Sequence, residues 1–88
     1  MDKQHLHQRL EELHKELQQV ESVDDNDRPT LQKLMADIQD LLEHDEEESR
    51  YGGLLEGLRE GIERFEASHP TATMLMGRVV DALAKMGI

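Results

Sequence analysis

The sequence predicts an all-α fold, an antiparallel bundle of four helices that forms a single domain over residues 1–88. In four stretches, apolar residues recur at alternating steps of four and three, and a mean step of about 3.5 places each set on one side of an α-helix. With one Tyr, one Phe and no Trp, the chain suits a slender bundle better than a β-sandwich. The four sets are Leu6, Leu10, Leu13, Leu17 and Val20; Leu31, Leu34, Ile38 and Leu41; Tyr51, Leu55, Leu58, Ile62 and Phe65; and Ala72, Met76, Val79, Leu83 and Met86.

The first two helices are expected over residues 3–22 and 28–44. Asp2 is a suitable N-cap for the first, because its carboxylate can accept from the free amides of the first turn. The polar run 24–27 contains no apolar residue and predicts a turn. Asp27 can cap the second helix, and Pro29 fits its first turn, where a missing amide costs nothing. The acidic run 45–48 predicts a frayed end and loop, because helix C-termini disfavour negative charge.

The last two helices are expected over residues 50–67 and 70–86, with Ser49 as a cap and Gly87 as a terminating residue. The alternative is a helical hairpin followed by one long helix kinked at Pro70, since the four-three spacing continues from Phe65 through His69. A break at Ser68–His69 is favoured, because proline inside a helix costs about 3 kcal/mol and the preceding residue avoids the α region. The similar helix lengths and short connections favour antiparallel packing of neighbouring helices. If the four helices form an open arrangement instead of a closed bundle, dimerisation would complete the bundle.

Three glycines spaced by four, Gly53, Gly57 and Gly61, lie in the third predicted helix away from its apolar set. Each costs about 1 kcal/mol relative to alanine inside a helix. Two interpretations follow: either the helix tolerates looseness here, or another backbone approaches it closely, as in small-xxx-small packing.

Charge and composition narrow the functional classes. Twenty acidic residues against ten basic ones give a formal charge of -10, which repels nucleic acid and anionic membrane surfaces. The chain has no cysteine, so neither a disulfide nor a thiolate metal site supports the fold. No apolar run resembles a signal peptide core or a membrane span. The cytoplasm is therefore the expected location, without nucleic-acid or membrane partners.

No residue pattern carries chemistry with any specificity. His7, Glu11 and His14 lie on one side of the first helix and could hold one zinc ion weakly, but a di-iron bundle needs a second Glu-x-x-His unit and two further glutamates. Most such residues on a charged helix are simply solvated. There is no phosphate-binding loop, and no nucleophile or small-molecule substrate site is evident. We therefore expect no catalytic, cofactor-binding or metal-binding residues and no enzymatic activity.

Two elements resemble a family of short acidic bacterial helical proteins known only as a domain of unknown function. They are the Phe-Glu-x-x-His-Pro pattern at 65–70 and the Leu-Ala-x-Met-Gly-Ile ending at 83–88. The resemblance implies a bacterial origin and a small helical fold, and it carries over no catalytic or binding residues.

The function favoured by these observations is a non-enzymatic helical protein–protein interaction module that self-associates as a homodimer or binds another protein. One alternative is an acidic decoy that occupies the surface of a basic nucleic-acid-binding protein, with carboxylates clustered at 24–27 and 43–48. A second alternative is a weak metal-binding protein that uses His7, Glu11 and His14.

Overall fold

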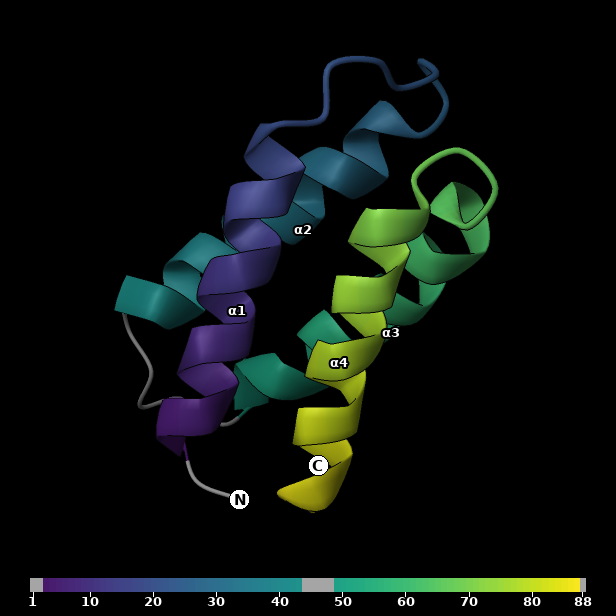
Figure 1. Cartoon of the computed structure of the whole chain (residues 1–88). Coiled ribbons are helices and arrows are strands. Elements are labelled where there is room, and N and C mark those ends of the chain that lie inside the picture. The colour runs from purple at the N-terminus through teal and green to yellow at the C-terminus, as the bar shows by residue number, and fades with distance from the viewer. Residues whose placement is uncertain (1–2, 44–48, 88) are drawn as a thin grey trace.

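The computed structural model describes residues 3–43 and 49–87, apart from the side chains of Lys3, Ser49 and Arg50. It contains the helices α1 (Lys3–Gln18), α2 (Arg28–Glu43), α3 (Ser49–Phe65) and α4 (Pro70–Lys85). Successive helices contact each other and α1 contacts α4, whereas within this part of the chain the backbones of the two diagonal pairs are not close to each other. The four helices therefore occupy the corners of a square antiparallel bundle (Figure 1), which confirms the predicted all-α fold.

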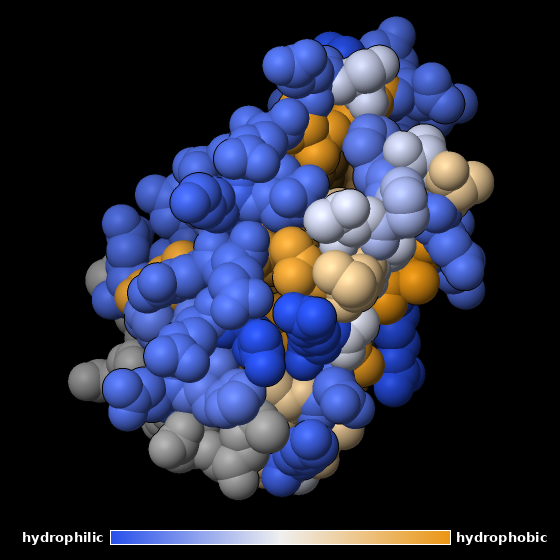
Figure 2. Space-filling model, viewed as in Figure 1, coloured by the Kyte–Doolittle hydropathy of each residue, from blue (hydrophilic) through white to orange (hydrophobic). Residues whose placement is uncertain are grey.

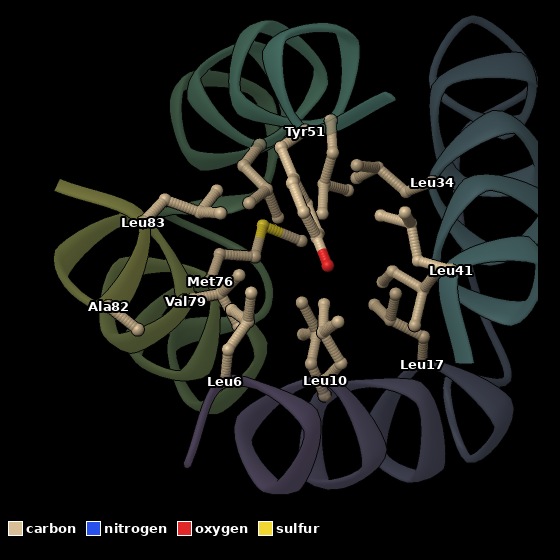
Figure 3. Close-up of a cluster of buried hydrophobic side chains, with 14 of the residues drawn as sticks. Leu6, Leu10, Leu17, Leu34, Leu41, Tyr51, Met76, Val79, Ala82 and Leu83 are labelled. Carbon is tan, nitrogen blue, oxygen red and sulfur yellow. The ribbon is translucent and has the colours of Figure 1, made fainter. Parts of the chain in front are cut away.

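All four helices contribute leucines and other apolar side chains to one core, which lies between them (Figure 3). Tyr51 reaches into the middle of this core from α3 and is 2% exposed. No buried side-chain nitrogen or oxygen in the described residues lacks a hydrogen-bond partner. The buried side chains are Leu6, Leu10, Leu13, Leu17, Leu34, Ile38, Leu41, Tyr51, Leu54, Leu58, Phe65, Ala72, Met76, Val79, Ala82 and Leu83.

The first helix is shorter than the predicted range of 3–22, because α1 ends at Gln18. The amides of Gln19 and Val20 donate to carbonyls three residues back, at 3.1 and 3.3 Å, which tightens and ends the helix. The chain then leaves the helical path, and Val23 packs against the core from outside the helix. The partial burial of this valine in the connection accounts for the loss of helix over the four predicted helical residues 19–22.

The third and fourth helices are separate, so the alternative of one long helix kinked at Pro70 is wrong. Helix α3 ends at Phe65, two residues before the predicted end at 67, and α4 begins at Pro70. His69 has φ -137° and ψ 70°, outside the α region, as expected for a residue before proline. Pro70 then occupies the first position of α4, where its missing amide costs no hydrogen bond.

Other boundaries agree with the prediction to within one residue, a difference that fraying accounts for. Helix α2 begins at Arg28 as expected, directly after Asp27. Helix α4 ends at Lys85, and Gly87 follows with φ +85°, the left-handed conformation that glycine adopts readily after a helix. The expected cap at Asp2, the end of the second helix at 44 and the acidic loop at 45–48 lie outside the described residues.

The buried face of α3 is rotated from the predicted apolar face. Leu54 is fully buried, whereas Leu55 and Ile62 are only partly buried. Gly57 and Gly61 face neighbouring helices: a β-carbon at Gly61 would lie 2.9 Å from Leu34 Cδ1 and 3.1 Å from Met76 Sδ. By contrast, nothing lies within 4 Å of one at Gly53. Side chains, rather than the expected second backbone, therefore make the close contacts at Gly57 and Gly61, and the looser interpretation applies only to Gly53.

Candidate interaction face

Two polar stripes flank the seam between α1 and α4, and each has residues at steps of four, three and four. The α1 stripe comprises His5, Arg9, Glu12 and Glu16, and the α4 stripe comprises Met74, Arg78, Asp81 and Lys85. This spacing keeps each stripe on one side of its helix. In both helices the apolar core residues also recur at steps of four, three and four, but they start from a different residue. Each stripe therefore runs along the helix parallel to the buried face.

The seam is hollowed where the two stripes approach each other. A cleft of about 280 Å³ is lined by His5 and Arg9 of α1 and by Arg78, Asp81, Ala82 and Lys85 of α4. Figure 2 shows this side of the molecule, with some of its most hydrophilic side chains between α1 and α4 and hydrophobic atoms along the same seam. Met74, on the α4 stripe, is the one large hydrophobic side chain classed as exposed within the described residues, at 51%.

Ion pairs within the stripes are long and solvent-exposed. Arg9 Nη1 lies 3.5 Å from Glu12 Oε1, and Lys85 Nζ lies 4.0 Å from Asp81 Oδ2. Pairs of this kind contribute about 0–1 kcal/mol. Arg78 and Glu16 have no ion-pair partner within residues 3–43 and 49–87. The charges of Arg78 and Glu16 are therefore available to other charges at little cost.

Net charge is segregated between the helices and the rest of the chain. All ten Lys and Arg residues and ten of the twenty acidic residues lie within the four helices, so the helices together are formally neutral. The remaining ten acidic residues lie in the connections and at Asp2, and they account for the whole formal charge of -10. The α1 and α4 stripes, with three Lys or Arg and three carboxylates, are neutral as well.

Arginines of the same chain partly neutralise the acidic α1–α2 connection. Arg28 Nη2 lies 3.3 Å from Asp25 Oδ1, and Arg64 of α3 donates to Asp27 Oδ1 at 2.9 Å and to Glu60 Oε1 at 3.1 Å. The hydrogen bond to Asp27, followed by that to Glu60, raises the pKa of Arg64 above its ordinary value. Because the pKa of Arg64 is higher in the folded state than in the unfolded state, the stabilisation from these hydrogen bonds persists at every pH below the ordinary arginine range. It is lost only in strong alkali.

The three residues of the metal-binding alternative, His7, Glu11 and His14, are not arranged around one point in the described structure. His7 Nε2 lies 3.2 Å from Glu11 Oε1, one helical turn away, so the contact is a surface pair within α1. No group of three or more His, Cys, Asp or Glu side chains in the described residues is arranged to hold a metal ion. The arrangement of these side chains therefore gives the metal-binding alternative no support.

His69 has a structural role at the turn between α3 and α4. Its ring packs edge-on against Phe65, with centroids 5.8 Å apart, and its Nδ1 lies 2.9 Å from Ser68 Oγ. Its backbone amide donates to the Phe65 carbonyl at 2.7 Å, and its carbonyl accepts from the Thr73 amide at 3.1 Å. The Phe-Glu-x-x-His-Pro pattern is thus the sequence of a helix-to-helix turn that contains an edge-on contact between two aromatic rings.

The fold and these surfaces define a small all-α bundle protein. Over residues 6–88 the chain matches a family described as a domain of unknown function (DUF4404), and it belongs to that family. This confirms the family resemblance. No curated protein and no solved structure matches the chain. None of the helices in the described residues combines the length and apolar character that a membrane span requires.

The two polar stripes were missed by the sequence analysis, which grouped His7, Glu11 and His14 instead. An equally regular spacing joins His5, Arg9, Glu12 and Glu16. However, regularly spaced polar residues, unlike apolar ones, do not indicate which side of a helix is buried. Only the position of α4 beside α1 shows that His5 and Arg9 share a cleft with Arg78. The signal that could have identified them is the sign pattern along the helix, two basic positions followed by two acidic ones.

Proposed function

We propose that this protein is a non-enzymatic helical protein–protein interaction module that forms a homodimer in the bacterial cytoplasm. The observation that carries the proposal is the segregation of charge, because a chain with a formal charge of -10 repels its own copies unless they meet through a neutral surface. The sides of the bundle are built from helices that are neutral in sum. The α1–α4 face adds the exposed Met74 to that neutrality.

The size of the bundle suits a modest interface. Its Cα extents are 34 × 20 × 19 Å, so one long side offers roughly 700 Å² per chain, and two copies would bury an area near the lower limit of stable interfaces, about 1,200 Å². Association is expected to be concentration-dependent on this basis. Catalysis receives no support from this face, because its cleft is lined mainly by exposed charged side chains, whereas acid–base work favours desolvated groups.

The alternative of an acidic decoy for a basic protein draws less support from the arrangement of carboxylates. A decoy needs its charges free and arrayed on one face, whereas Asp25 and Asp27 already pair with Arg28 and Arg64. The acidic run 45–48 lies outside the described residues.

Sedimentation equilibrium of the full chain over a wide concentration range tests the homodimer. A mass that rises from one chain toward two, at an ionic strength near 0.15 M, is the expected result. A single-chain mass at every concentration, with an intact helical circular dichroism spectrum, would refute it. If the chain is monomeric and captures another protein from the native cytoplasm, the homodimer is refuted, but the proposal of an interaction module stands with a different partner.

A further inference from the structure

We propose that two copies of the chain pair antiparallel across their α1–α4 faces, with each polar stripe meeting its own twofold-related copy. This inference rests on the proposed homodimer and specifies its interface. In order along the helix, the α1 stripe reads His5, Arg9, Glu12, Glu16, with basic residues in its first half and acidic residues in its second. Reversing the direction of such a stripe exchanges its basic and acidic positions, so it is complementary to an antiparallel copy of itself.

The pairs follow from the spacing. A twofold axis that crosses α1 between Arg9 and Glu12 places Arg9 opposite Glu12 of the second copy, and His5 opposite its Glu16. The symmetry repeats each contact, as an isologous interface requires. The stripe spans 11 residues, about 16 Å at 1.5 Å per residue, and has the same four-three-four steps in both directions.

The central pair of the α4 stripe has the same complementarity about its midpoint. An axis between Arg78 and Asp81 places these two residues opposite each other in the two copies, while Met74 meets the long side chain of Lys85, whose methylene stem can cover it. Arg78 has no ion-pair partner in the described part of its own chain. The second copy therefore supplies a carboxylate that the isolated chain does not give it.

One axis serves both stripes because their midpoints lie at similar heights along the bundle. Arg9, Arg78 and Asp81 line the same cleft. Arg9 belongs to the first half of α1 and Arg78 to the second half of α4, and these halves lie side by side because the two helices are antiparallel. The partly buried Leu55 and Ile62 of α3 carry no charge pattern that indicates what would cover them.

A charge-swap experiment tests this arrangement. The double variant Arg9→Glu/Arg78→Glu makes both stripes predominantly acidic, and the double variant Glu12→Lys/Asp81→Lys makes them predominantly basic. Each variant alone is expected to dimerise at least about tenfold more weakly than the wild type, because attractive pairs become repulsive on both sides of the axis. An equimolar mixture is expected to recover a heterodimer, identified by native mass spectrometry from the mass of its two different chains.

Two controls separate the local pattern from net charge. Lys33→Glu/Arg59→Glu has the same net charge as the acidic variant but changes exposed residues of α2 and α3, so it should dimerise several-fold more tightly than the acidic variant. The basic variant has less net negative charge than the wild type, so long-range repulsion alone would predict tighter self-association for it. Stripe pairing predicts weaker association. Circular dichroism checks that each variant is helical, and Arg9→Gln/Arg78→Gln replaces the acidic variant if that variant fails to fold, with the same direction of effect.

The outcomes also distinguish this inference from the proposed function. If the wild type dimerises and the reversed variants dimerise equally well, the stripe pairing is overturned while the homodimer remains. If the variants weaken but their mixture does not recover pairing, the antiparallel arrangement is overturned. If the wild type remains a single chain at all concentrations, the proposed homodimer itself fails.

Discussion

Gly61 and Gly53 have opposite surroundings although both lie in α3. A β-carbon at Gly61 would lie 2.9 Å from Leu34 Cδ1, whereas one at Gly53 would have nothing within 4 Å. Gly53→Ala should therefore raise the free energy of unfolding by about 0.5–1 kcal/mol through helix propensity. Gly61→Ala should gain less, because Leu34 and Met76 must shift. Urea unfolding of both variants measures the difference, and equal stabilisation would contradict the close contact.

Leu54 and Leu55 provide a matched pair for the rotated face of α3. Leu54 is 0% exposed, and its neighbour Leu55 is only partly buried. Leu54→Ala should cost about 2–5 kcal/mol, as expected for a large-to-small change in a packed core, and Leu55→Ala should cost clearly less. Thermal or urea unfolding can compare them. A larger loss for Leu55→Ala would restore the face predicted from the four-three spacing.

At the scale of the elements, the turn between α3 and α4 depends on an aromatic contact. His69 packs edge-on against Phe65 at 5.8 Å, and aromatic pairs of this geometry contribute about 0.5–1.5 kcal/mol beyond burial. His69→Ala should lower stability by about that amount, while His69→Phe, which keeps a ring, should lose less. Urea midpoints give the comparison, and indistinguishable values for the two variants would show that the ring contact contributes nothing.

Most of the helical framework could be predicted from the sequence because leucine spacing and burial are directly linked. Leu10, Leu34, Leu58 and Leu83 were placed on apolar faces, and all four are buried. The end of α1 could not be placed because Val20 continues the four-three count. The spacing does not reveal that the chain leaves the helix to pack Val23.

The rotation of α3 and the interaction face escaped prediction for related reasons. Glycine has no apolar side chain, so Gly57 and Gly61 looked separate from the apolar set, yet their small size lets Leu34 and Met76 approach. The stripes contain charged residues whose significance depends on a neighbouring helix. The sequence around Arg9 gives no indication that Arg78 lines the same cleft.

For the whole molecule, charge outside the helices should make stability dependent on ionic strength. Like charges in the connections repel in the folded chain, and salt screens this repulsion. Raising NaCl from about 20 to 200 mM, where the Debye length shortens from roughly 20 to 7 Å, should therefore raise the melting temperature at low protein concentration.

Glu21→Gln/Asp24→Asn should reduce this salt dependence, because both residues are exposed in the α1–α2 connection. Gln4→Glu, at an exposed position of α1, serves as a comparison, because it changes the number of charges on the chain outside this connection. A melting temperature that falls with added salt in the wild type would indicate that favourable ion pairs such as Arg64 with Asp27 outweigh the repulsion.

The acidic α1–α2 connection also has a consequence for how far assembly could proceed. Glu21, Asp24, Asp25, Asp27 and Glu66 belong to the two turns that line a common hollow at one tip of the rod, where Ser22 and Val23 meet Ser68 and His69. Stacking rods tip to tip would crowd these carboxylates together. Lateral pairing has no such obstacle, so growth into filaments is discouraged while a closed pair remains possible.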